Sequence, residues 1–400
     1  MSSKAPRSER LKIGIIGRRN VGKSSLINSL INQDVAIVSS TPGTTTDPVA
    51  KHYELLPIGP VTFYDTAGID DEGEVGEKRI KSTEKIIFRS DIALVITDEK
   101  GLKKYEKDII NKMDEMNIPF IVIFNKNDLN PPSKDDIDFC KNNHLQFISI
   151  SAKENKNIDS LKEKIISIVP KYFKKENVII GDLIRGGDFV VLVVPIDLAA
   201  PKGRLILPQV QVIREILDND AIAITVKEKE IAEVFNKIDK KPKLVITDSQ
   251  VVLRVSPDVP KDINFTTFST AFARYKGDLE KLVQGAKEID HLETNDKVLI
   301  AEACSHHIQS DDIGRVKIPR WLMQYTGKKL DIDVASGHDF PEDLEKYKLV
   351  IHCGACMLTG IEMKRRINQC YRRKVPITNY GVTISKVHGL LERVIKPFGL

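Results

Sequence analysis

The feature that most constrains the fold is a glycine-rich segment near the beginning of the sequence. The apolar run Leu11–Ile16 leads directly into Gly17–Ser24, which reads GRRNVGKS, and a helix is predicted over Ser25–Asn32. Glycines in such a loop let backbone N–H groups surround a phosphate, and the helix N-terminus adds a favourable field. A strand, a loop and a helix in this order predict an α/β fold with a phosphate site after its first strand.

The residue types in this segment predict that the phosphate belongs to a nucleotide bound with Mg²⁺. Lys23 would reach the β and γ phosphates, and the Ser24 hydroxyl would bind the metal ion. Gly17 and Gly22 let the backbone approach the phosphates, and Ser25 lies in the first turn of the helix behind them.

Two further segments carry residues that a nucleotide-hydrolysing switch needs. Thr45 lies in a polar loop after the first helix, where a threonine can close on Mg²⁺. Asp65 ends the predicted strand Val61–Tyr64 and can hold a water molecule on Mg²⁺. The N–H group of Gly68, in the same loop, can sense the γ-phosphate.

A third segment predicts which base the nucleotide carries. Asn125, Lys126 and Asp128 follow the predicted strand Phe120–Phe124. The Asp128 carboxylate can accept hydrogen bonds from the N1–H and the exocyclic amine of guanine, which adenine does not supply. The base pocket is completed by Ser151, Ala152 and Lys153. In this order and spacing, the motifs predict a GTP-binding domain over residues 1–170.

About the first 165 residues resemble the GTPases of the TrmE–Era type in these motifs. Asn20 matches a position that helps to hold K⁺ beside the phosphates in potassium-activated members, although loop geometry alone explains it equally well. The residue after Gly68 is Ile69, so no glutamine stands there to orient the attacking water. The resemblance therefore implies a slow GTPase that K⁺ stimulates.

Charge and apolar content disfavour some other functions. The 400 residues include 61 basic and 56 acidic side chains, and a net charge of +5 does not indicate a nucleic-acid protein. The first residues contain no apolar signal region, and no apolar run is long enough to span a bilayer. We therefore expect a cytoplasmic protein of about two to four domains that binds neither nucleic acid nor membrane.

Residues 171–275 predict a small α/β domain without catalytic residues, behind a charged linker at 171–177. Its strands are predicted at 189–194, 221–226 and 243–247, and its helices at 207–217 and 230–238. This alternation predicts parallel strand pairing. A sheet of so few strands leaves an edge that needs covering, and we therefore predict a homodimer or a higher homo-oligomer.

Residues 276–400 continue the alternation and add cysteines after strands. Strands are predicted at 297–301, 330–334, 348–351 and 376–378, and helices at 279–289, 318–325, 359–371 and 384–395. Ligands of open α/β sheets bind outside the carboxyl ends of the strands. Because Cys304, Cys353 and Cys356 follow two of these strands, their thiolates are expected to converge.

The residues alone leave two kinds of metal group open. A structural zinc site takes four nitrogen or sulfur ligands, and either His306 or His352 would complete it. A 4Fe–4S cluster takes four thiolates, so with three one iron keeps a weaker or exchangeable ligand. Neither Cys140, in the GTP-binding part, nor Cys370, on the core side of a helix, is placed to be a fourth ligand.

The spacing Cys304-x-His306 and then His352-Cys353-x-x-Cys356, behind a TrmE–Era-like domain, resembles the HydF family of GTPase maturation factors and scaffolds for FeFe-hydrogenases. The resemblance implies three domains: a P-loop GTPase fold, a small α/β dimerisation domain and a C-terminal α/β iron–sulfur cluster domain over residues 276–400. It implies a 4Fe–4S cluster on the three cysteines with a replaceable fourth ligand. A diiron precursor would be carried there and passed to apo FeFe-hydrogenase, with two radical-SAM maturation enzymes as further partners.

The family pattern includes His306 and His352 but leaves their roles open. Either imidazole is the replaceable iron ligand, or it orients and tunes the site from behind the ligands, and Glu302 is an alternative ligand. A rival function is an RNA- or ribosome-associated GTPase with a structural zinc domain. The near-neutral charge and the absence of a KH-type module argue against it.

Overall fold

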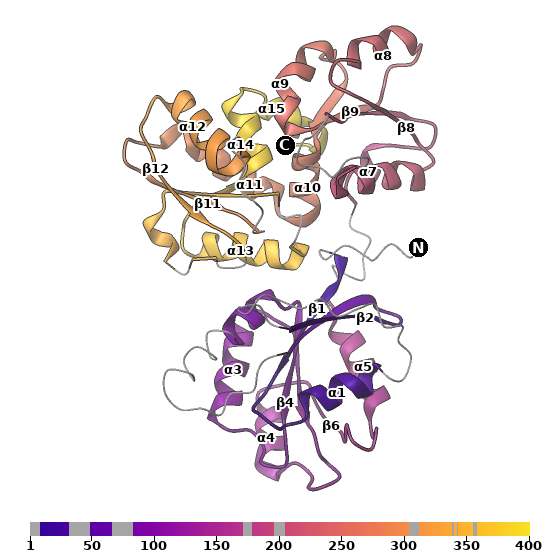
Figure 1. The fold of residues 1–400 in the computed structure, drawn as a ribbon, viewed down its shortest axis with the longest axis vertical. Helices are drawn as coiled ribbons and strands as arrows, with labels where there is room; N and C mark the ends of the chain where they lie inside the picture. The colour runs from indigo at the N-terminus through magenta and orange to yellow at the C-terminus, as the bar shows by residue number, and fades with distance from the viewer. Residues whose placement is uncertain are drawn as a thin grey trace. The chain divides into compact units, whose positions relative to one another are not determined.

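The computed structural model describes residues 9–31, 49–65, 83–170, 178–195, 205–303, 312–337, 340–341, 343–354 and 358–400. It divides into two compact units, Met1–Glu176 and Asn177–Leu400 (Figure 1). Several residues singled out in the sequence lie outside the described residues: Thr45, Gly68, Ile69, the linker 171–177, Cys304, His306 and Cys356.

The first unit is built on a six-stranded sheet with the strand order β2-β3-β1-β4-β5-β6. The strands are β1 (Leu11–Ile16), β2 (Val49–Leu55), β3 (Gly59–Asp65), β4 (Ile92–Thr97), β5 (Phe120–Phe124) and β6 (Phe147–Ser149). β2 is antiparallel to β3, and the other neighbours pair in parallel. Every residue of β1 and β4 is buried, which is typical of strands covered on both faces.

Helices cover both faces of this sheet. They are α1 (Lys23–Ile31), a segment at 83–89, α3 (Lys104–Glu115), α4 (Lys134–Asn142) and α5 (Ile158–Ile168). Side chains alternate between the faces of a strand. Accordingly, Ile13 and Ile15 of β1 pack in one apolar group with Leu26 of α1, and Ile16 packs in another with Ile110 of α3. The end of β1, from which the following loop starts, is therefore held between two packed layers.

The second unit begins with a four-stranded sheet of order β10-β9-β7-β8, whose neighbours all pair in parallel, as predicted. Its strands are β7 (Phe189–Val193), β8 (Ile222–Val226), β9 (Leu244–Thr247) and β10 (Asn264–Thr267). Its helices are α7 (Leu207–Asp218), α8 (Ile231–Lys237), α9 (Val252–Val255) and α10 (Phe268–Lys276). The sequence did not predict β10 or α10.

A second parallel sheet, of order β12-β11-β13-β14, follows in the same unit. Its strands are β11 (Lys297–Ala301), β12 (Asp331–Ala335), β13 (Leu349–His352) and β14 (Ile377–Asn379). Its helices are α11 (Leu279–Lys287), α12 (Ile318–Thr326), α13 (Gly360–Arg372), α14 (Tyr380–Val387) and α15 (Leu391–Ile395), with α13 and α12 on opposite faces (Figure 1).

The prediction of one last helix over 384–395 was wrong. The structure has two helices there, α14 and α15, and Gly389 between them has a φ of +70°. Glycine adopts this left-handed conformation without a steric penalty and commonly ends a helix.

The two sheets of the second unit share one apolar core. It contains Val191 and Val245 from the first of these sheets together with Leu299 and Val350 from the second. Helix α15 returns to the first sheet, where the hydroxyl of buried Thr266 donates to the Val394 carbonyl at 2.8 Å. None of the described helices has the length and apolar content that crossing a bilayer requires.

Candidate functional site

The loop between β1 and α1 has the geometry of a phosphate loop. A Cβ on Gly17 would lie 2.3 Å from the Ile96 carbonyl oxygen, and one on Gly22 would lie 2.3 Å from Asn125 Nδ2. Gly22 also has a φ of +92°. Lys23 Nζ donates to the carbonyl oxygens of Gly17 and Arg18, both at 2.8 Å, so the ammonium lies over the loop. Only glycine fits at these two positions, and the loop has a cation on it.

Exposed polar side chains border this loop. Ser24 and Ser25 lie exposed in the first turn of α1, where helix N–H groups have no partner within the helix. Asn20 is exposed as well and has a φ of +61°. Both the hydroxyl predicted to bind Mg²⁺ and the amide predicted to assist K⁺ are therefore accessible from outside the loop.

Asp65, at the end of β3, has the properties of a Mg²⁺-binding carboxylate. It pairs with Ile15 of β1, just before the phosphate loop. Its Oδ1 is buried and has no hydrogen-bond partner among the described residues. Burial raises the pKa of Asp65, and the positive charges of Lys23 and Lys51 oppose that effect. A buried carboxylate oxygen without a partner fits a cation or its bound water at this position.

The residues predicted to read the base come together after β5 and β6. Asn125 is buried, donates from Nδ2 to the Val21 carbonyl at 2.8 Å and accepts at Oδ1 from the Ala152 N–H at 3.0 Å. A hydrogen bond from Ser151 holds the pKa of Asp128 below its ordinary value. Asp128 Oδ1 is buried without a partner in the described part of the chain. An ionised carboxylate with an unused oxygen suits the two donors of guanine.

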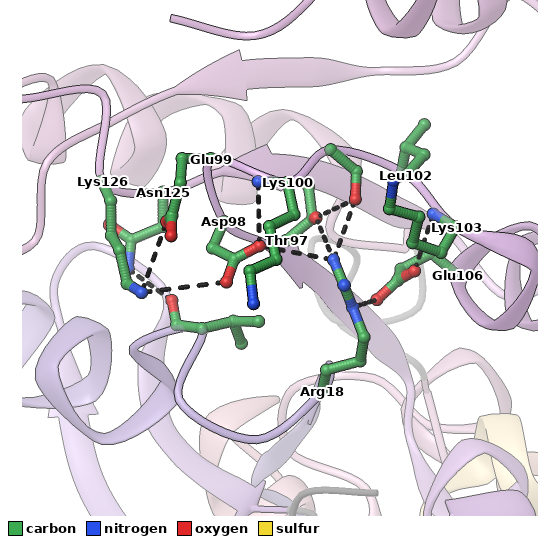
Figure 2. Close-up of polar contacts among 12 residues, drawn as sticks. Arg18, Thr97, Asp98, Glu99, Lys100, Leu102, Lys103, Glu106, Asn125 and Lys126 are labelled. Carbon is green, nitrogen blue, oxygen red and sulfur yellow. Dashed lines mark hydrogen bonds and ion pairs between the residues drawn. The ribbon is translucent and has the colours of Figure 1, made fainter. Parts of the chain in front are cut away.

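Neighbouring residues extend the base pocket and connect it to the phosphate loop. Lys126 is half-buried with a φ of +61°, while Lys153 is exposed. Figure 2 shows Lys126 and Arg18 on either side of Asp98. Sequence reasoning missed Arg18, Asp98 and Glu106, because their partners are distant in the sequence. The only signal was the position of Asp98 directly after a buried strand.

In the second unit, Cys353 lies where the predicted thiolate site requires it. It follows β13, and its Sγ accepts a hydrogen bond from the Ala303 N–H, after the neighbouring strand β11, at 3.1 Å. Its own N–H donates to the Ala301 carbonyl at 2.8 Å. An N–H donor at a sulfur stabilises a thiolate and is one of the features that tune iron–sulfur clusters. The carboxyl ends of β11 and β13 therefore place a sulfur that accepts an N–H hydrogen bond at the predicted edge.

His352, at the end of β13, is fully buried and hydrogen-bonded at both ring nitrogens. Nε2 lies 2.9 Å from Arg366 Nη1, and Nδ1 lies 2.8 Å from the Cys353 carbonyl oxygen. Because arginine only donates, Nε2 accepts, and Nδ1 carries the hydrogen that the carbonyl accepts. Burial, assisted by the charge of Arg366, lowers the pKa of His352 to about 3. The imidazole is neutral and fixes the backbone of Cys353.

Glu302, the alternative ligand, is buried after β11 and paired. Its Oε2 lies 2.7 Å from Arg315 Nη2 and 3.1 Å from Arg315 Nε, and it also accepts from the Ser336 hydroxyl. Removing one partner of such a buried pair is costly. The pairing favours a structural role for this carboxylate.

A buried cation lies in the same pocket as Cys353. The pocket is lined by Phe272, Ala273, Lys276, Gly277, Leu282, Cys353, Gly354, Met363 and Asn379. Lys276, at the end of α10, is 4% exposed and donates from Nζ to the Leu358 carbonyl at 3.2 Å. Helix α10 therefore places an amino group in the lining of the same pocket as the thiol.

The remaining predicted ligands are not brought together within the described residues. No group of three or more His, Cys, Asp or Glu side chains there could hold a metal ion, and Cys304, His306 and Cys356 lie outside that part. Cys140 and Cys370 are buried, and burial raises their pKa values to about 11 and about 12. Cys370 faces the core from α13, as predicted.

Family models match three stretches of the chain. Residues 12–126 match 50S ribosome-binding GTPase, residues 179–277 match the Hydrogen maturase F dimerization domain, and residues 280–397 match the Hydrogen maturase F tetramerization domain. The last two together match more than half of the chain.

Curated relatives resemble the first unit. GTPase Der of Nautilia profundicola is 34% identical over 178 residues, which is 41% of this chain and 38% of that relative. The tRNA modification GTPase MnmE of Clostridioides difficile is 36% identical over 173 residues, which is 42% of this chain and 37% of that relative. The chain thus spans less than two fifths of the length of these relatives.

Among solved structures, an Era variant of Aquifex aeolicus bound to GDP and aluminium fluoride is 28% identical, with a TM-score of 0.33. The match covers 40% of this chain and 56% of that chain.

The phosphate loop, the mostly parallel sheet and the base pocket define the first unit as a P-loop GTPase domain, which two α/β domains follow. With both hydrogen maturase F models matching the second unit, the chain belongs to the hydrogen maturase F family. The predicted fold class is confirmed.

Proposed function

We propose that this chain is a GTP-hydrolysing scaffold that carries a 4Fe–4S cluster and a diiron precursor and delivers the diiron unit to apo FeFe-hydrogenase. The observation that carries the proposal is the presence of two different sites in one chain of this family. One unit brings together residues predicted to read guanine, Asn125 and Ala152, and the other has a hydrogen-bonded sulfur, that of Cys353, after a strand of a parallel sheet. We place the domains at 1–170, 171–275 and 276–400.

The first unit binds GTP and Mg²⁺ in this proposal. Lys23 binds the β and γ phosphates, Ser24 and Asp65 hold Mg²⁺ directly or through water, and Asp128 selects guanine. Bound Mg²⁺ supplies charge that offsets the negative charge of the phosphates. Thr45 and Gly68 act at the γ-phosphate. Support comes from the buried, partnerless oxygens of Asp65 and Asp128 in the described part of the chain.

Turnover is slow and is stimulated by K⁺. Ile69 provides no group to orient water, and the exposed amide of Asn20 borders the phosphate loop. A K⁺ ion beside the phosphates would add positive charge where negative charge develops. Cycling between GTP and GDP would then act as a switch.

In the second unit, Cys304, Cys353 and Cys356 hold the 4Fe–4S cluster. When bound, the cluster would supply an iron whose fourth ligand is exchangeable. His306 is the remaining histidine candidate for that ligand. His352 acts from behind the ligands, since both of its ring nitrogens are hydrogen-bonded. Lys276 lies in the Cys353 pocket and would offset the negative charge of thiolates and cluster. The diiron precursor is cargo.

The proposed partners are further copies of this chain, apo FeFe-hydrogenase and two radical-SAM maturation enzymes. Binding to nucleic acid or to a membrane is not part of the proposal. The matched dimerization and tetramerization domains support a homo-oligomer. Strand β8 is at an edge of its sheet, and Ile222 on it is 44% exposed. Apolar side chains on an exposed edge strand suit pairing with a second copy.

Purification and reconstitution without oxygen test the proposal. The parent chain is expected to bind iron and sulfide, to show the brown colour of a cluster, and to activate apo-hydrogenase in a complete maturation assay. Replacing Cys353 by Ala should lower bound iron and abolish that activation while GTP hydrolysis continues. A colourless protein that binds zinc instead would contradict the proposal, as would a Cys353→Ala variant that activates apo-hydrogenase at the parental level.

A further inference from the structure

A network of side chains in the first unit joins three loops that the motifs treat separately. In Figure 2, the guanidinium of Arg18 points from the phosphate loop toward the segment between β4 and α3. Its Nε donates to Glu106 Oε1 at 2.7 Å, and its Nη2 donates to Thr97 Oγ1 at 3.1 Å and to the Gly101 carbonyl at 2.9 Å. The side chain of Arg18 therefore ties the phosphate loop to this segment.

The groups that accept hydrogen bonds from Arg18 are themselves held in place by further hydrogen bonds. Glu106 is completely buried, and its other oxygen accepts from the Lys103 N–H at 2.9 Å, at the start of α3. The buried hydroxyl of Thr97 donates to the Gly101 carbonyl at 2.6 Å. A buried carboxylate paired with a guanidinium has little freedom to move. Arg18 is thus anchored to a rigid part of the fold.

Asp98 continues the network to the base pocket. Its Oδ1 lies 3.4 Å from Arg18 Nη2, and its Oδ2 lies 3.8 Å from Lys126 Nζ. Asp98 is 8% exposed, so water screens these charges less than on an open surface. Glu99 Oε2 also lies 3.4 Å from Lys126 Nζ. One carboxylate, Asp98, stands between a cation of the phosphate loop and a cation of the base loop.

We propose that Arg18 and Asp98 are positioning residues that hold the phosphate loop and the base loop at a fixed separation. This inference rests on the proposed binding of GTP. The carbonyl of Arg18 is one of the two acceptors of Lys23 Nζ, so anchoring Arg18 also places the phosphate-binding ammonium. When both subsites are already in position, binding one half of a nucleotide raises the effective concentration of the other half.

Asp98→Asn tests this coupling because it removes the negative charge and keeps the size of the side chain. The Kd for GDP is expected to rise roughly tenfold, which corresponds to about 1.4 kcal/mol. In steady-state hydrolysis, KM should rise more than kcat falls. Inorganic pyrophosphate occupies the phosphate loop alone. Its inhibition constant, obtained by competition with a labelled nucleotide and corrected for the Kd of that nucleotide, should be the same in the variant and in the parent.

Lys112→Ala is the matched control. Lys112 is in the last turn of α3, away from the network, and pairs with Glu84. Its loss should leave the Kd for GDP unchanged. An Asp98→Asn variant whose Kd for GDP stays within about twofold of the parent would overturn the inference, with or without a lower Tm. Equal weakening of pyrophosphate and GDP would overturn it too, since the damage would then lie in the phosphate loop.

Arg18 needs a variant that avoids an unpaired buried charge. Arg18→Ala alone leaves Glu106 without its guanidinium, so the double variant Arg18→Met with Glu106→Gln is the better test. It should remain folded and bind GDP more weakly than the parent, whereas parental affinity would contradict the inference. A parent that binds neither GTP nor GDP in the same assay would contradict the proposed function instead, which separates the two failures.

Discussion

The proposed nucleotide site and the proposed thiolate site differ in how their motif residues are hydrogen-bonded. In the nucleotide site, Asp65 and Asp128 each have a buried oxygen without a partner among the described residues. In the thiolate site, the motif residue His352 has both ring nitrogens hydrogen-bonded within the protein. The comparison teaches that a motif identifies a site, whereas the hydrogen bonds of each residue separate ligand contacts from supports.

The largest expected effect comes from Lys23→Ala and tests whether the two sites are separable. Loss of the ammonium should lower GTP hydrolysis about 10²–10³-fold, as when one group that stabilises transition-state charge is removed. Iron and sulfide bound after reconstitution should stay at the parental level, because the second unit has its own core. GTP hydrolysis and bound iron are measured on the same preparation. A loss of iron in this variant would show that the two sites are not independent.

Asp128→Asn tests whether a carboxylate with an unused oxygen is a ligand contact. Charge-assisted hydrogen bonds to guanine would be lost, so the Kd for GTP should rise roughly 100-fold. Xanthosine triphosphate, whose base has an acceptor in place of one donor, should then bind better than GTP. Titration with both nucleotides checks this, with Asp135→Asn on α4 as the control. Unchanged GTP affinity would mean that Asp128 does not contact the base.

His352→Ala tests whether a motif residue with both ring nitrogens hydrogen-bonded is a support and not a ligand. Arg366 would lose its acceptor in a buried site, and the free energy of unfolding of the second unit should fall by about 1–3 kcal/mol. If the imidazole is only a support, the spectrum of the iron that remains bound should match that of the parent. His388→Ala is the control, since His388 is half-buried and makes an edge-to-face ring contact with Trp321. A changed iron spectrum would instead make His352 a ligand.

Acid should destabilise the second unit through the same histidine. The pKa of His352 is about 3 in the folded chain, below the ordinary value of 6.5. The unfolded chain therefore binds the proton first, and stability present above about pH 6.5 is lost as the pH falls toward 3, by at most about 1.4 kcal/mol per pH unit. Chemical unfolding of the parent and of His352→Gln at several pH values measures this. If the free energy of unfolding changed equally with pH in the two proteins, the acid effect would not come from His352.

The smallest expected effect concerns the cation beside the phosphate loop. Initial rates of GTP hydrolysis should be severalfold higher in KCl than in NaCl at equal ionic strength, because an ion held by Asn20 would add positive charge next to the phosphates. Asn20→Ala should remove the difference while leaving the rate in NaCl nearly unchanged. Equal rates of the parent in both salts would show that the φ of Asn20 serves the shape of the loop alone.

Much of this architecture follows from local patterns, and the exceptions have physical reasons. β1 reads LKIGII and β13 reads LVIH, and both are short and mostly apolar, so the sequence predicts both strands and the sites after them. β10 reads NFTT, and the sequence did not predict it because two of its three buried residues are threonines, so it lacks an apolar run. The route of the Arg18 side chain was not predictable, because its partners Thr97 and Glu106 are 79 and 88 residues away. The hydrogen bond at His352 Nε2 likewise depends on Arg366, which lies on helix α13.

The apolar core that the two sheets of the second unit share has a consequence for how the chain loses its structure. Since buried side chains of both sheets pack in one cluster, neither sheet can separate without exposing the interior of the other. Heating should therefore give two calorimetric transitions, one per compact unit, although family models divide the chain into three parts. A substitution on β8 that weakens this core, against which Ile224 and Val226 pack, would then also loosen the loop that carries Cys353.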